Sequence, residues 1–135
     1  MSYSIAELDA CEPGIADRLK SMGIRTTARL LEAAKDPKGR KLLAERTGLS
    51  PQCLLRAANI ADKMRIKGIG EEYAELLEAA GVDTVRALKY RNPANLAKKM
   101  AEANKQRKLV RSIPSEKSIE RWIEDAKKLP IKISY

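Results

Sequence analysis

Hydrophobic residues recur along the chain at the three- and four-residue spacing that is typical of amphipathic helices. The clearest example lies near the C-terminus, where apolar side chains stand at i, i+3, i+4 and i+7: Ile119, Trp122, Ile123 and Ala126. Runs of β-branched residues are absent, and residues that favour helices dominate throughout the chain. The pattern therefore predicts an all-helical protein made of short segments.

Turn residues divide this pattern into separate helices. Short polar residues that can cap a helix start stand at Thr26, Asp36, Ser50, Thr84, Asn92 and Ser115. Three of these residues are followed by proline, which suits the first turn of a helix. Gly23 and Gly81 stand where a left-handed residue is expected to end a helix. We therefore expect each half of the chain to contain a series of short helices.

The chain contains an internal repeat with an offset of 58 residues, in which residues 19–26 align with residues 77–84. The offset has grown to 65 where Ser50 aligns with Ser115, so the second copy has gained residues around 105–111. Repeats on this scale are duplicated supersecondary units. We predict two units, at residues 1–64 and 65–129, followed by a C-terminal tail at residues 130–135.

The segment Gly68-Ile69-Gly70, with predicted helices on both sides, is typical of a helix-hairpin-helix turn. The first glycine permits a sharp reversal after a helix end, and Ile69 is expected to fill the space between the two helices. The second glycine has no Cβ, so a ligand can approach the backbone there. The start of the next helix offers unpaired N–H groups and a positive dipole end, which suit a phosphate, and Lys67 adds a charge.

Three further segments resemble this turn. Gly48-Leu49-Ser50 has serine in place of the second glycine, and residues 111–115 are a third version. Residues 9–13 are a degenerate fourth version, in which Ala10 and Glu12 replace the glycines. Each unit then holds two hairpins, which is the arrangement of a tandem helix-hairpin-helix domain.

The stretches from Met64 to Val85 and from Lys108 to Pro130 resemble a bacterial helix-hairpin-helix family that is defined as a domain of unknown function. The resemblance covers nearly the whole chain. It implies an all-α fold in which two tandem helix-hairpin-helix (SAM-like) five-helix units pack together. Members of the wider superfamily bind DNA without sequence preference through hairpin backbone amides. Carried over to this chain, that role falls on Lys67, Gly68, Ile69 and Gly70, and more weakly on Gly48 and Ser50.

The charge of the chain also favours a polyanion as ligand. It has 27 lysine and arginine residues against 18 aspartate and glutamate residues, a net charge of +9. Residues 98–111, the basic segment, hold a single acidic residue, Glu102, and six cationic side chains: Lys98, Lys99, Lys105, Arg107, Lys108 and Arg111. We expect a bound polyanion to follow the basic segment and the Gly68–Gly70 turn. A solvated helix face is the alternative interpretation.

Acidic residues at the hairpins oppose this prediction. Glu71 and Glu72 directly follow the second glycine, where they stabilise the helix start but repel a phosphate. Two hypotheses therefore stay open. The first is sequence-independent DNA binding, and the second is a protein-interaction or scaffold module that kept the fold without binding DNA. The sequence does not distinguish DNA from RNA, and it leaves the oligomeric state open.

Several functions have no support in the sequence. The chain has no histidine, which excludes catalysis and metal sites that depend on this residue. It contains neither a P-loop nor a nucleophile elbow. We therefore expect no enzymatic activity, no cofactor and no metal.

The cysteines and the termini predict a location. Cys11 and Cys53 stand apart without metal-ligand spacing, and we expect buried free thiols in a reducing cytoplasm, with a disulfide between them as the alternative. The N-terminus does not resemble a signal peptide, and no apolar run is long enough to span a membrane. Tyr73 and Trp122 are expected to anchor the small core.

Overall fold

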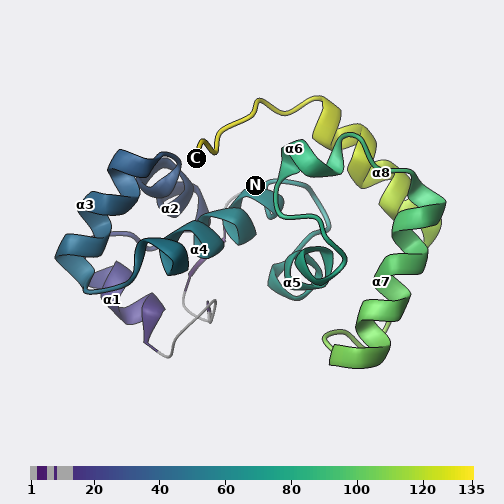
Figure 1. The fold of residues 1–135 in the computed structure, drawn as a ribbon, viewed down its shortest axis with the longest axis horizontal. Helices are drawn as coiled ribbons and strands as arrows, with labels where there is room; N and C mark the ends of the chain where they lie inside the picture. Colours follow the sequence, from purple (N-terminus) through teal and green to yellow (C-terminus); the bar gives the residue numbers. More distant parts are fainter. Residues whose placement is uncertain (1–2, 6–7, 9–13) are drawn as a thin grey trace. The chain divides into compact units, whose positions relative to one another are not determined.

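The computed structural model describes residues 3–5, 8 and 14–135, and this part of the chain contains eight helices and no strand (Figure 1). The helices are α1 (Ile15–Ser21), α2 (Thr27–Ala34), α3 (Pro37–Thr47), α4 (Pro51–Lys63), α5 (Glu71–Ala79), α6 (Val85–Leu88), α7 (Pro93–Arg107) and α8 (Glu116–Lys127). One isolated antiparallel bridge pairs Ser4 with Thr26. The predicted all-α class is confirmed.

The chain divides into two compact units. Unit 1 comprises Met1–Arg65 together with Lys132–Tyr135, and unit 2 comprises Ile66–Ile131. Helices α1–α4 belong to unit 1, and α5–α8 belong to unit 2. Unit 2 is described throughout and holds four helices, so the expectation of a five-helix unit is wrong there. The segment Ile66–Gly70 before α5 is a turn and adds no helix to the four.

The end of the C-terminal tail belongs to unit 1 rather than standing apart. The Ser134 N–H donates to the Lys35 carbonyl oxygen at 2.8 Å, and the Arg40 side chain donates to the Ser134 carbonyl oxygen at 2.7 Å. The Lys132 ammonium lies 2.6 Å from the Glu32 carboxylate, and Ile133 is buried. These contacts come from residues about a hundred positions apart, so sequence periodicity carries no sign of them.

The expected helix caps are present in both units. Each capping side chain accepts a hydrogen bond from the backbone N–H three residues later, as N-cap residues do. The six residues are Thr26, Asp36, Ser50, Thr84, Asn92 and Ser115. The helix ends also correspond, because Gly23 and Gly81 both have positive φ and are followed by the same bond: Ile24 N–H to the Leu19 oxygen and Val82 N–H to the Leu77 oxygen.

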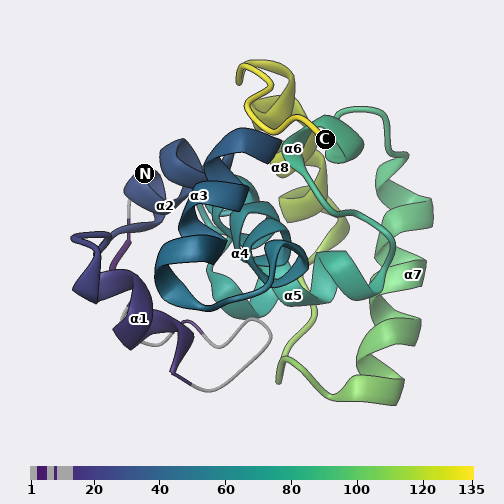
Figure 2. The ribbon, with the colours of Figure 1, turned by 60° about the vertical axis from the view of Figure 1, so that its left-hand side comes forward.

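Each unit buries aliphatic side chains between its helices. In unit 1, α2, α3 and α4 pack against one another, and in unit 2, α7 packs against α5 and α8 while α6 packs against α8 (Figure 2). Trp122 and Tyr73 of unit 2 form an aromatic pair with ring centroids 5.4 Å apart, and Trp122 is 4% exposed. Trp122 is therefore a core anchor, as the sequence predicted, whereas Tyr73 is only partly buried.

Cys53 differs from expectation. Its side chain is buried in α4, but it is disulfide-bonded, so the prediction of a free thiol at this position is wrong. Cys11, the other cysteine of the chain, lies outside the described residues. The separation of two cysteines along a chain does not report their separation in space. Among the described residues, no helix is long and apolar enough to cross a membrane.

Candidate nucleic-acid interface

The turn Ile66–Gly70 in unit 2 has the backbone that the sequence predicts for a hairpin. Gly68 has φ of +94°, a left-handed conformation that favours glycine. The Ile69 N–H donates to the Ile66 carbonyl oxygen at 3.1 Å, which closes the turn. The Ile69 side chain is fully buried, whereas Lys67 and Gly68 are exposed. The apolar residue thus holds the turn to the core and leaves its polar backbone facing solvent.

Gly70 is the N-cap of α5, and its geometry does not itself require glycine. Its φ of −92° and ψ of −173° are open to any residue. Apart from its neighbours in the chain, no described residue would lie within 4 Å of a Cβ added to Gly70. Glycine here provides no side chain to cap the helix, so the first turn of α5 receives no side-chain cap hydrogen bond. The N-cap residue of α5 thus supplies no side-chain acceptor, and helix starts of this kind bind anions well.

The turn Gly48–Ser50 in unit 1 has the same plan but a different third residue. Gly48 has φ of +78°, and Leu49 is 2% exposed, which matches Gly68 and Ile69. Ser50, however, accepts the Cys53 N–H at 3.0 Å through its own hydroxyl oxygen. Pro51 then has no N–H to offer. The start of α4 therefore has fewer backbone N–H donors than the start of α5, and one of them is already bonded to Ser50.

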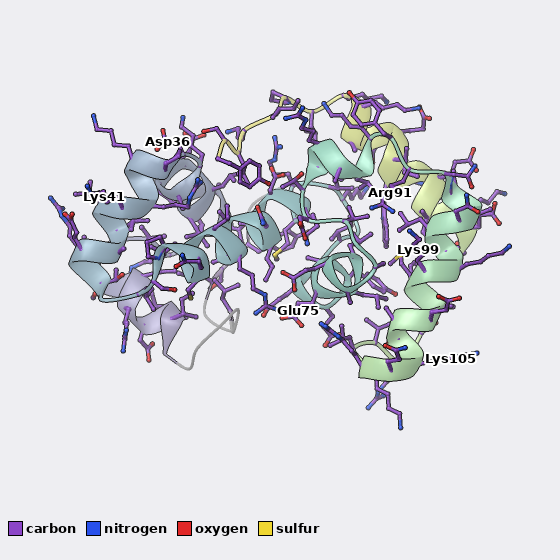
Figure 3. The ribbon with its side chains drawn as sticks, in the orientation of Figure 1. Asp36, Lys41, Glu75, Arg91, Lys99 and Lys105 are labelled. Atoms are coloured by element: carbon purple, nitrogen blue, oxygen red, sulfur yellow. The ribbon has the colours of Figure 1, made fainter. Side chains whose placement is uncertain are left out.

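The six cations of the basic segment are all exposed. Four of them lie on α7: Lys98, Lys99, Lys105 and Arg107. Figure 3 labels two of these four residues, Lys99 and Lys105. Lys108 caps the end of α7 with φ of 51°, and Arg111 lies in the following loop. None of the six side chains forms an ion pair within the described part of the chain. Their charges are therefore available to an external polyanion.

The third expected hairpin, at residues 111–115, has a different geometry. Within the described residues, the left-handed position of this loop is Lys108, and none of residues 111–115 has positive φ. The Asn104 side chain accepts the Val110 N–H and donates to the Val110 carbonyl oxygen, both at 3.0 Å. The residues that the second copy gained thus lengthen both the helix, from 11 residues in α3 to 15 in α7, and the loop that follows it. The fourth expected hairpin, residues 9–13, lies outside the described residues, Glu12 included.

An open pocket of about 770 Å³ joins the first turn of α5 to the end of the basic segment. It is lined by Glu72, Tyr73 and residues 108–112, and therefore includes Lys108 and Arg111. The Tyr73 hydroxyl donates to the Ser112 carbonyl oxygen at 3.0 Å, which fixes the loop against α5. The structure thus brings two cations of the basic segment to the helix that follows Gly70.

The other predicted residues of the basic segment lie further along α7. Lys99 and Arg107 line a second pocket, of about 320 Å³, together with Ala79 and Ala80 at the opposite end of α5. Lys98 and Lys105 line neither pocket. The structure therefore divides the basic segment into two groups along α5, with Lys108 and Arg111 beside its first turn.

Trp122 is a member of this region that the sequence assigned only to the core. A Cβ added to Gly68 would lie 3.2 Å from Trp122 Nε1, so the indole nitrogen lies against the turn. The Trp122 ring also packs on Tyr73, in the first turn of α5. No local pattern could place a residue of α8 beside Gly68, because 54 positions separate them in the chain.

The chain belongs to the family described as a domain of unknown function, DUF4332, whose model matches residues 10–129. No solved structure matches the chain. The family assignment thus spans both units, and the function has to be argued from the surface of this chain.

Proposed function

We propose that this protein binds nucleic acid, with the DNA phosphate backbone as ligand, without reading base sequence and without catalysing a reaction. The observation that carries the proposal is Gly70. It sits at a helix start with an ordinary backbone conformation, open space around its Cα and no capping side chain. The backbone conformation at this position does not require glycine. The absence of a side chain does, however, let a phosphate approach the N–H groups of α5.

The finer architecture is part of the same proposal. Both units repeat one order of caps, left-handed glycines and helices, and each contains a turn in which a positive-φ glycine precedes a buried aliphatic residue. Such turns are what two tandem helix-hairpin-helix units would contain. Unit 2 retains the glycine that leaves its helix start open, and it is therefore the ligand-binding copy.

The charge distribution supports a polyanion rather than a small anion. Residues 65–135 hold 16 basic and 10 acidic residues, and the cations of the basic segment are exposed and make no ion pairs within the described residues. Their spread along α7 suits a ligand with several phosphates in a row. Contacts of this kind position a nucleic acid without specifying its bases.

The acidic first turn of α5 favours a second candidate function. Glu71 and Glu72 stabilise the helix dipole and repel a phosphate, which would suit a protein partner with a basic surface. Glu72, however, lines the same pocket as Lys108 and Arg111, so cations outnumber the carboxylate there. The formal charge of this lining is positive, and DNA binding is the function that we retain.

The test is a titration of fluorescently labelled duplex and single-stranded DNA with the protein, followed by anisotropy over a series of salt concentrations. We expect a dissociation constant of about micromolar, and log affinity that falls with log salt by about 0.9 for each phosphate neutralised. Lys67→Glu should weaken binding, and the triple reversal Lys105→Glu/Arg107→Glu/Lys108→Glu should weaken it further and reduce the salt slope.

A matched control exists on the equivalent helix of unit 1. Lys38, Lys41 and Arg46 are exposed on α3, and their reversal to glutamate changes the net charge by the same amount as the triple reversal on α7. The control should retain most of the affinity. Equal losses in the two triple variants would show that net charge alone drives binding. Undetectable binding by the unmodified protein at physiological salt would remove the DNA proposal and favour the protein-partner candidate.

A further inference from the structure

The indole of Trp122 has an unusual position for a core side chain. Trp122 is 4% exposed, yet its Nε1–H has no hydrogen-bond partner in the described part of the chain. Buried tryptophans usually find an acceptor for this donor. Among the described residues, Asn59 Oδ1 is the one fully sealed side-chain polar atom that lacks a partner. The Trp122 nitrogen is therefore open to solvent although its ring is packed.

The indole nitrogen lies beside the hairpin. Trp122 Nε1 would stand 3.2 Å from a Cβ on Gly68, so only a glycine leaves the space beside it clear. The ring is held by Tyr73, whose centroid lies 5.4 Å away and whose hydroxyl is fixed by Ser112. Trp122 thus lies against Gly68, which precedes the helix start at Gly70, and against Tyr73, which lies in the first turn of α5.

We propose that the Trp122 indole N–H is a donor to the same phosphate that binds at the start of α5. The proposal rests on the proposed function, because it takes the hairpin as a phosphate site. Gly68 and Gly70 leave the backbone open, Lys67 supplies a charge, and the indole supplies a neutral donor with a fixed direction. A hydrogen bond to a charged oxygen is stronger than one to a neutral acceptor. The ligand is a phosphate group, carried either by a polynucleotide or by free inorganic phosphate.

Because Trp122 is the only tryptophan, it gives a single indole N–H cross-peak in a proton–nitrogen correlation spectrum of the unmodified protein. That peak should move when duplex DNA is added, in proportion to the bound fraction measured by anisotropy. A parallel titration with inorganic phosphate separates the two sources of the ligand. Movement with phosphate alone shows that the hairpin binds the isolated group, and movement only with DNA shows that neighbouring contacts are needed. Both results support the proposal.

Substitution tests the same contact independently. Trp122→Phe keeps an aromatic ring against Tyr73 but has no N–H, and it should lower DNA affinity by about tenfold. Ile123→Val is the matched control, since it removes one buried methyl group from the same helix and keeps the indole, and it should change affinity by less than about twofold. Circular dichroism establishes that both variants are folded. If Trp122→Phe does not fold, the cross-peak of the unmodified protein decides.

The outcomes separate this inference from the proposed function. If DNA binds with the expected salt dependence while the indole peak stays still, the donor role is wrong and the DNA function stands. The same conclusion follows if folded Trp122→Phe binds as well as the unmodified protein. If the unmodified protein binds no DNA but inorganic phosphate moves the indole peak, the proposed function fails and the donor role stands. If neither ligand moves the peak, the donor role is wrong.

Discussion

The two turns Gly48–Ser50 and Gly68–Gly70 have one backbone plan and different third residues. Both begin with a left-handed glycine and bury the aliphatic residue that follows. Ser50 then closes its helix start with its own hydroxyl, whereas Gly70 leaves its helix start uncapped. The difference teaches that the first two positions of such a turn serve the fold and the third decides whether the helix end stays available to a ligand.

The surroundings of the two turns differ in the same direction. A Cβ on Gly48 would meet only the Arg18 side chain at 3.8 Å, whereas Gly68 lies against an indole donor and near a pocket that contains Lys108 and Arg111. In unit 1, the C-terminal tail adds contacts to α2 and α3 instead. The turn at Gly68 thus lies beside groups that suit a phosphate, whereas the tail contacts of unit 1 join residues within the chain.

The largest expected effect tests the shared part of the plan. Ile69→Ala and Leu49→Ala should each lower the free energy of unfolding by about 2–5 kcal/mol, because both remove buried methyl groups from a packed site. Urea denaturation followed by circular dichroism measures both losses. A loss below about 1 kcal/mol at either position would show that its turn is not held by the core.

The left-handed glycines should give the next largest effect. Gly48→Ala is expected to cost about 1–2 kcal/mol, because a residue with a Cβ is strained at positive φ. Gly68→Ala should cost more, since its Cβ would also press on Trp122 Nε1 at 3.2 Å. Thermal unfolding of the two variants side by side measures the difference. Equal midpoints would mean that the indole moves aside freely.

Exchanging the third residues should separate stability from binding. Ser50→Ala removes a cap and should cost about 1 kcal/mol of stability, with DNA affinity unchanged. Gly70→Ser should change stability by only a few tenths of a kcal/mol, but it should weaken DNA binding several-fold, because the hydroxyl would occupy a helix donor. Denaturation and anisotropy on the same samples provide the readouts. An unchanged affinity of Gly70→Ser would remove the observation on which the proposed function depends.

The smallest expected effect concerns the tail contact that is confined to unit 1. Hydrogen bonds from Lys132 and then from Lys35 lower the pKa of Glu32 below its ordinary value. The stabilisation from this carboxylate is therefore fully present above the ordinary glutamate pKa and is lost as the pH falls through the lowered value. Nuclear magnetic resonance between about pH 6 and pH 3 should show Lys132–Tyr135 signals moving with Glu32 titration. Glu32→Gln should remove the pH-dependent movement of the Lys132 signals over that range.

Much of the local structure could be predicted from the sequence because it depends on neighbouring residues. Capping residues such as Ser50 and Asn92 act on N–H groups three positions away, and Gly23 and Gly81 end helices through their own backbone freedom. The hairpin Gly68–Gly70 was predicted for the same reason. The count of helices in unit 2 and the loop at 108–115 were not predicted, because the count was taken from the family resemblance and the left-handed residue of the loop is Lys108 rather than a glycine.

By itself the sequence determined the helical class, the caps, the internal duplication and the excess of positive charge, all of which arise from local conformational preferences and composition. Tertiary structure alone decided the bonded state of Cys53, the attachment of Lys132–Tyr135 to unit 1, and the approach of Trp122 to Gly68. These features join residues that are far apart in the chain. The packing of whole helices brings such residues together, and the spacing of residues along the sequence does not predict these contacts.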